Sequence, residues 1–172
     1  MMNETVKTIL ERRSVRKFTR DKISKDDLLT ITQCGLHAPS ARGMEKWHFT
    51  IINDDKLIDE LKGIMQGLLN NEDFNMYDPT ALIIVSTDRT LKFGIDDNAC
   101  ALENIFLAAT SLGIGSVWIN QLRDFVDATE LRAFLDKLEV PSDHVVYGIA
   151  ALGYPADAPA PKQRKGTFKY FG

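Results

Sequence analysis

Near its amino terminus the chain contains Glu11-Arg12-Arg13-Ser14-Val15-Arg16-Lys17-Phe18, in which three arginines and one serine fall within five residues. An arginine presents a planar fork of N–H donors that matches two phosphate oxygens at once, and a serine hydroxyl adds a further hydrogen bond. The stretch therefore predicts a site for an anionic group. The alternative is a solvated basic end of the first helix, where cations suit the negative pole of the helix dipole.

The composition limits the kind of anion. The chain has 172 residues, of which 44% are hydrophobic, and a formal net charge of −3. This length is enough to bury one core, so we expect a single domain over residues 1–172. A nucleic-acid binder usually presents a broad positive face, so a local basic cluster in an otherwise acidic chain favours one small anionic ligand and no nucleic-acid partner.

The histidines and cysteines do not predict a metal site. His37, His48 and His144 lack the spacing of metal ligands, and Cys34 and Cys100 lie in apolar helical contexts, which predicts buried free thiols of a reducing compartment. The chain starts without the apolar region of a signal peptide, and no apolar stretch is long enough to span a bilayer. We expect a cytoplasmic protein without a membrane partner.

Helical and strand patterns intermix along the chain without a strict βαβ order, which favours an α+β fold. Helices are predicted at about 4–12 after Asn3, from Ser24 to about Gly35, from Asn53 or Asp54 to about 69, at 97–112, and from Asp127 to about 138. Leu28, Leu29, Ile31 and Thr32 are expected to face the core. Strands are predicted at 47–52, 81–86, 115–119 and 145–152, and residues 70–79 as an exposed loop.

The last twenty residues are predicted to be an extended arm, about 153–172. Its prolines exclude a helix, and it carries Lys162 and Arg164 before an aromatic end. We expect this end to pack in the core or against a second subunit rather than to recognise a substrate.

Four segments resemble, in order, the signatures of the FMN-dependent nitroreductase family. They are Arg12–Phe18, Ala38-Pro39-Ser40-Ala41 leading to Trp47-His48-Phe49, Asn104 through Leu112-Gly113-Ile114-Gly115-Ser116-Val117-Trp118, and Gly153-Tyr154-Pro155 with Lys162 and Arg164. The resemblance implies an α+β sandwich with a central mixed, largely antiparallel sheet flanked by helices. It also implies an intertwined homodimer with FMN at the subunit interface.

The resemblance implies that the protein is an NAD(P)H-dependent flavin oxidoreductase. Hydride from NADH or NADPH would reach flavin N5, and the electrons would leave to a nitroaromatic, quinone or related small-molecule acceptor by a ping-pong mechanism. Because the flavin carries the chemistry, no catalytic side chain is predicted.

The resemblance also implies where FMN binds. The first segment, with Arg12, Arg13, Ser14 and Arg16, would hold the phosphate, the ribityl chain and the pyrimidine edge. A loop that reaches the partner subunit's flavin would contain Pro39, Ser40, Ala41 and Gly43. The backbone of Trp118, Ile119 and Asn120 would lie beside N5, and Lys162 and Arg164 would form a C-terminal phosphate clamp. For Trp118, a place in the core is an equal alternative.

The chain departs from the family pattern in the second segment, where Gly43, Glu45 and Lys46 replace the usual asparagine, glutamine and proline. The stretch between Leu69 and Asp97 is also too short for the helical excursion that covers the active site in larger members. These departures leave two alternatives open. One is a related flavin reductase or dehalogenase with a different acceptor, and the other is a non-catalytic flavin-binding carrier or sensor.

Overall fold

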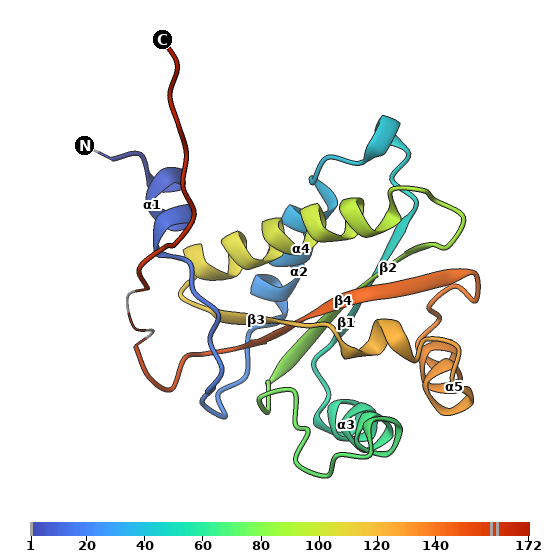
Figure 1. Ribbon diagram of the computed structural model, residues 1–172. Coiled ribbons are helices and arrows are strands. Elements are labelled where there is room, and N and C mark those ends of the chain that lie inside the picture. Colours follow the sequence, from blue (N-terminus) through green and yellow to red (C-terminus); the bar gives the residue numbers. More distant parts are fainter. Residues whose placement is uncertain (1, 159, 161) are drawn as a thin grey trace.

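The computed structural model describes residues 2–158, 160 and 162–172. It contains one four-stranded sheet between two layers of helices (Figure 1). The strands are β1 (Trp47–Ile52), β2 (Ala81–Asp88), β3 (Gly115–Ile119) and β4 (His144–Gly153), in the spatial order β1-β2-β4-β3. All three strand pairings are antiparallel. The parallel component expected in a mixed sheet is limited, among the described residues, to one bridge between Ser14 and Ser116.

The helices are α1 (Glu4–Glu11), α2 (Lys25–Leu36), α3 (Asp55–Leu69), α4 (Gly94–Ser111) and α5 (Thr129–Lys137), with short 3₁₀ turns η1 (Ala41–Gly43) and η2 (Gln121–Asp124). Side-chain caps begin three of them, because Asn3, Ser24 and Asp54 each accept a hydrogen bond from a backbone N–H of the first turn. Gly113, with φ of +72°, follows α4 in the left-handed conformation expected of a helix C-cap glycine.

Both faces of the sheet are buried, which explains the nearly continuous apolar runs of its central strands. In β2, Leu82 and Ile84 pack toward α3 and α5, whereas Ile83 and Val85 pack toward α2 and α4. The sequence-based boundaries of all four strands hold to within two residues. The α+β sandwich is therefore confirmed, whereas a single domain over 1–172 stays a prediction.

Several sequence-based expectations are wrong in detail. Leu29 is 48% exposed instead of facing the core. Cys34 is half-buried and Cys100 is exposed, although neither forms a disulfide. Asp127 does not cap α5, whose N-cap is Ala128 without a side-chain bond, because the Asp127 carboxylate instead accepts two hydrogen bonds from Arg89.

Two connections also differ from expectation. The 70–79 loop is not wholly exposed, since Met76 is buried in the core with 2% exposure. Helix α4 begins at Gly94, three residues before the predicted start, and only residues 89–93 separate it from β2. The link between β2 and α4 therefore contains no helix.

Within the described ranges, no helix has both the length and the apolar character needed to cross a bilayer.

Candidate functional site

The basic stretch is held against the edge of the sheet. Ser14 forms the parallel bridge with Ser116 in β3, and Val15 N–H donates to the Ser116 carbonyl over 2.9 Å. Val15 is buried against Gly115, where an added Cβ would lie 2.9 Å from the Val15 side chain. Since alternate residues of an extended segment face opposite sides, burial of Val15 turns Ser14 and Arg16 toward the surface.

A pocket of about 150 Å³ lies at this edge and gathers predicted residues from two segments. Arg12 and Ser14 line it from the basic stretch, and Trp118 lines it from β3. Trp118 is 38% exposed, so it is not a core residue. Its neighbours Ile119 and Asn120 differ, because Ile119 is buried in the core and Asn120 is exposed.

The same pocket contains residues that the sequence analysis missed. Ser116 is 1% exposed, and its hydroxyl has no hydrogen-bond partner. Glu103 of α4 forms an ion pair with Arg12, with 3.3 Å between Oε1 and Nε. A polar residue inside the apolar strand pattern of 115–119 was the available signal for Ser116. No sequence signal distinguished Glu103 from a solvated helical glutamate.

The two other arginines of the stretch are placed differently. Arg13 donates from Nη1 to the carbonyl oxygens of Leu10 and Arg12, at 2.7 and 2.8 Å, and so satisfies the carboxyl end of α1. Arg16 lies with its guanidinium carbon 5.7 Å from the ring centre of Tyr77. It also lines a second pocket, of about 170 Å³, which shares Ser14 with the first.

The base of the C-terminal arm borders this second pocket. Ala156 N–H donates to the Lys17 carbonyl over 3.0 Å, and Lys17 Nζ lies 3.5 Å from a carboxylate oxygen of Asp157. Figure 1 shows the arm continuing past α1 to the carboxyl terminus. Lys162 and Arg164 are exposed on it and are not among the residues that line either pocket.

The Pro39–Gly43 segment lies elsewhere, at the first turn of α4. Ala41 N–H donates to Asp97 Oδ1 over 2.8 Å, and Gly43 N–H donates to the Ser40 carbonyl over 3.0 Å. Gly43 has φ of +61°, a conformation that glycine adopts without steric cost. Pro39 is exposed and Ser40 is half-buried. Ala41 borders a third pocket, of about 230 Å³, which shares no lining residue with the Arg12 pocket.

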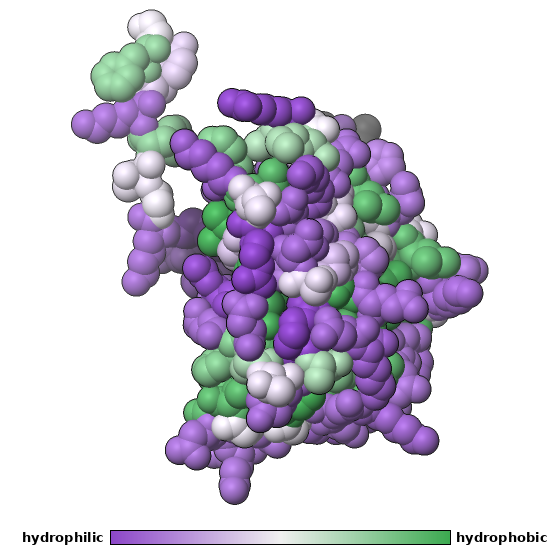
Figure 2. Space-filling model, turned by 90° about the vertical axis from the view of Figure 1, so that its right-hand side faces the viewer, coloured by the Kyte–Doolittle hydropathy of each residue, from purple (hydrophilic) through white to green (hydrophobic). Residues whose placement is uncertain are grey.

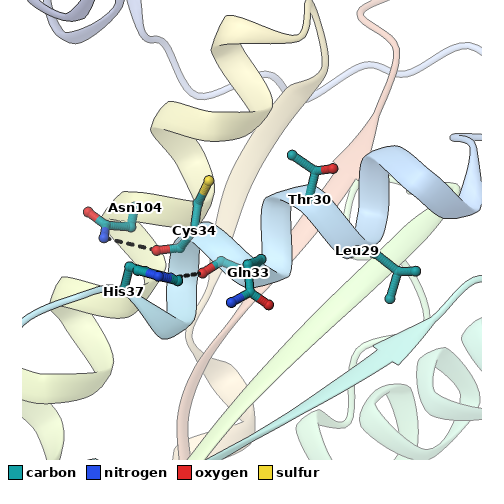
Figure 3. Close-up of a pocket in the computed structure, with 6 residues that line it drawn as sticks. All are labelled: Leu29, Thr30, Gln33, Cys34, His37 and Asn104. Carbon is teal, nitrogen blue, oxygen red and sulfur yellow. Dashed lines mark hydrogen bonds between the residues drawn. The ribbon is translucent and has the colours of Figure 1, made fainter.

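An exposed apolar surface covers α1, α2 and the end of α4. Its exposed side chains are Val6, Ile9, Leu10, Leu29, Leu36 and Leu112, each between 40% and 56% exposed. Two open hollows of about 670 and 350 Å³ lie on this surface and share Cys34 and Asn104. Figure 3 shows the larger one, where the Asn104 amide from α4 donates to the Cys34 carbonyl of α2 over 3.0 Å.

Comparison with known proteins gives the family. The model of the nitroreductase family matches residues 9–78 and 68–154. A protein of Archaeoglobus fulgidus, provisionally named NADH dehydrogenase/NAD(P)H nitroreductase, is 32% identical over 91% of this chain and 88% of its own. The NADPH-flavin oxidoreductase of Vibrio harveyi is 29% identical over 95% of this chain and 70% of its own.

A solved structure extends the match to three dimensions. The crystal structure of a nitroreductase with bound FMN from Bacteroides fragilis superposes with a TM-score of 0.90 and 40% identity. The match covers 99% of this chain and 100% of the other. The chain therefore belongs to the nitroreductase family.

Proposed function

We propose that this protein is an FMN-dependent oxidoreductase that takes hydride from NADH or NADPH and passes electrons to a nitroaromatic, quinone or related acceptor. The observation that carries the proposal is the convergence of Arg12, Ser14, Ser116 and Trp118 on one pocket at the edge of the sheet. The FMN bound by the 40% identical B. fragilis protein supports the same cofactor here.

The residues in the pocket fit FMN. A buried hydroxyl without a partner costs about 1–3 kcal/mol, so the Ser116 Oγ favours a ligand with a polar atom at this point. The ion pair between Arg12 and Glu103 uses Nε and leaves the terminal guanidinium nitrogens for an anion or a carbonyl oxygen. Trp118 supplies an exposed indole against which a planar ring system could stack.

When bound, FMN would supply hydride acceptance from the nicotinamide and electron delivery to the acceptor. The chain's own residues would bind and orient it. A cation such as Arg12 or Arg16 beside the pyrimidine edge would raise the reduction potential of the flavin. We also propose that Lys162 and Arg164 bind the phosphate, as the resemblance implies. The arm's base is already fixed beside Ser14 and Arg16 through Lys17 and Asp157.

We further propose a homodimer whose interface covers the apolar surface of α1, α2 and α4. Helix α1 buries none of its residues within the chain, although its apolar side chains are spaced along one face. Six large apolar side chains are exposed on or directly after three adjoining helices, and an exposed apolar patch of this kind indicates a candidate interaction site. An interface of this kind, extended by the arm, would exceed about 2,000 Å².

The dimer would complete the cofactor site. Within one chain the Pro39–Gly43 segment and the Arg12 pocket share no lining residue. Asp97, which holds Ala41, and Glu103, which pairs with Arg12, are six residues apart on α4, or about 9 Å along its axis and about 120° around it. This separation supports our proposal that the loop contacts the flavin of the partner subunit.

Three measurements test the proposal. Heat release and chromatography identify the flavin, anaerobic mixing with NADH or NADPH tests reduction, and a panel of nitroaromatics and quinones tests reoxidation. Recovery of FAD, or of no flavin after reconstitution, would contradict the assignment. Flavin that binds but is not reduced by either nicotinamide would instead indicate the carrier or sensor. A cytoplasmic location stays a prediction that cell fractionation can test.

A further inference from the structure

We propose that the 230 Å³ pocket between η1 and the β2–α4 turn binds the anionic group of the planar molecule that exchanges electrons with the cofactor. The inference rests on the proposed function, because it places this pocket beside the partner subunit's flavin. The lining of this pocket includes Arg42, Met44, Thr90, Lys92, Phe93 and Asp97. Below, this site is called the η1 pocket.

The walls of the η1 pocket are fixed before any ligand binds. On one side, Ala41 N–H donates to Asp97 Oδ1 over 2.8 Å. On the other side, the Thr90 hydroxyl and backbone N–H donate to Asp88 Oδ1 over 2.6 and 2.8 Å, and Lys46 donates to Asp88 Oδ2 over 3.0 Å. The two bonds from Thr90 contribute most, and the bond from Lys46 contributes next, to a pKa of Asp88 far below its usual value. Asp88 therefore stays ionised and joins the two loops at all ordinary pH values.

The charges in the η1 pocket favour an anion. The Asp97 carboxylate is 5% exposed, accepts the Ala41 N–H, and lies in the first turn of α4, where the helix dipole stabilises it. Arg42 and Lys92 are exposed, and within the described part of the chain neither takes part in an ion pair. Helix α4 also begins without a side-chain cap at Phe93. Two cations that form no ion pair with a described residue therefore line a pocket whose single carboxylate already accepts the Ala41 N–H.

The apolar residues favour a planar ring next to that anion. Phe93 and Met44 are 43% and 44% exposed at the rim, and Lys92 Nζ lies 5.3 Å from the centre of the Phe93 ring. The volume is below the roughly 300–1,000 Å³ of pockets that enclose drug-sized ligands, so one substituted ring or one phosphate-bearing group fits, and a whole dinucleotide does not. The five-residue link between β2 and α4 leaves the pocket without a helical cover.

Two molecules present an anion next to a planar ring: an aromatic acceptor that carries a carboxylate, and NADPH, whose 2′-phosphate lies next to its adenine. The test measures both half-reactions in the FMN-loaded dimer, using an Arg42→Gln/Lys92→Gln variant and Lys56→Gln as the matched control. Lys56 is an exposed lysine on α3, away from every pocket considered above. The probes are 4-nitrobenzoate and its neutral methyl ester as acceptors, and NADPH and NADH as donors.

For a carboxylate-bearing acceptor, we expect the double variant to lose about ten-fold in kcat/KM for 4-nitrobenzoate and less than two-fold for the ester. For the donor phosphate, we expect the same loss in the rate of reduction by NADPH and not by NADH. The Lys56→Gln control should match the wild-type protein in all four reactions. Added salt should shrink either effect, since exposed charges are screened.

Unchanged ratios in both half-reactions, with normal flavin reduction, would overturn this inference and leave the proposed function standing. A protein whose flavin is not reduced by either nicotinamide would overturn both. A charge-reversing Lys92→Glu variant provides a second test in case the neutral substitutions have only a small effect. It should lower the rate with the anionic probe, relative to the neutral probe, by a larger factor than the neutral substitutions do. Equal loss for the charged and neutral probes would also refute anion recognition, since it would indicate general damage to the loop.

Discussion

Substitution of Gly148 by alanine should displace Trp118 from the proposed flavin pocket. Gly148 lies in β4 beside β3, and a Cβ added there would be 2.2 Å from Trp118 Nε1 and 2.7 Å from Cε2. Carbon contacts are optimal at about 3.5–4.0 Å, so the indole would have to move by more than about 1 Å. Phe106 lies on the indole with ring centres 6.1 Å apart, which limits that movement.

The expected cost follows from the overpacking. Inserting a methyl group into a well-packed region typically costs about 1–3 kcal/mol. For a chain of this length that corresponds to a fall in Tm of roughly 2–12 °C. The same change should weaken FMN binding, because Trp118 lines the pocket. Urea unfolding gives the stability, and titration of the apoprotein gives the affinity.

The controls separate the clash from a general effect of replacing glycine. Gly67 lies in α3 with no atom within 4 Å of an added Cβ, so Gly67→Ala should leave FMN binding unchanged and stabilise the helix by about 0.5–1 kcal/mol. A Trp118→Leu substitution should remove most of the cost of Gly148→Ala in the double variant. Indole fluorescence in a Trp47→Phe background reports the movement directly. Wild-type stability, FMN affinity and fluorescence in Gly148→Ala would refute the reasoning.

Three further outcomes follow from the same structure. Arg12→Ala and Arg164→Ala should each raise the dissociation constant of FMN by about ten-fold, measured by apoprotein titration, because a charge-assisted bond is lost; unchanged affinity in both would place the phosphate elsewhere. Ile9→Asp in α1 should shift the dimer toward monomer and release flavin, which sedimentation at the flavin absorbance would detect; a monomer with full FMN would contradict the shared site. Burial lowers the pKa of His144; the nearby His48 lowers it further, whereas Asp143 and Asp88 partly oppose the shift. Between this lowered pKa and the unfolded value of about 6.5, the unfolded chain therefore binds more protons than the folded chain. Stability should therefore fall as the pH drops below about 6.5, and His144→Gln should reduce that slope in urea unfolding.

Local chemistry explains which parts of the fold could be predicted from sequence. Asn3, Ser24 and Asp54 cap their helices because the bond joins a side chain to a backbone N–H two or three residues away. The strands were predictable because both faces of the sheet are buried, so β2 begins with five apolar residues and β4 is apolar over most of its length. Interactions between distant segments were not predictable. Asp127 shows this, because its partner Arg89 is 38 residues away.

The candidate site was predictable only where a residue type carries the chemistry by itself. Arg12 and Ser14 stood out in the sequence, whereas Ser116 and Glu103 became recognisable only when β3 and α4 were placed beside them. Leu29 was expected in the core because helical periodicity identifies an apolar face but not what covers it. In the proposed dimer, the second subunit would cover this side chain.

Helix α4 gives a physical reason to expect that the proposed cofactor site is built from two chains. Its middle carries Glu103, paired with Arg12, and its first turn carries Asp97, bonded to Ala41. A rigid helix fixes the distance and the angle between these anchors, so no loop movement in one subunit brings Ala41 into the Arg12 pocket without breaking the bond to Asp97. We expect the same of the arm, since its aromatic end, with Phe168 and Phe171 at least 89% exposed, projects from the body of the molecule (Figure 2). A partner subunit related by a two-fold axis near the exposed face of α1, α2 and α4 would cover the apolar side chains and bind the arm. The same symmetry would bring the Ala41 loop of each subunit to the Arg12 pocket of the other. Dimerisation and cofactor binding would then be linked equilibria. Added FMN should favour the dimer, and a higher protein concentration should favour FMN binding.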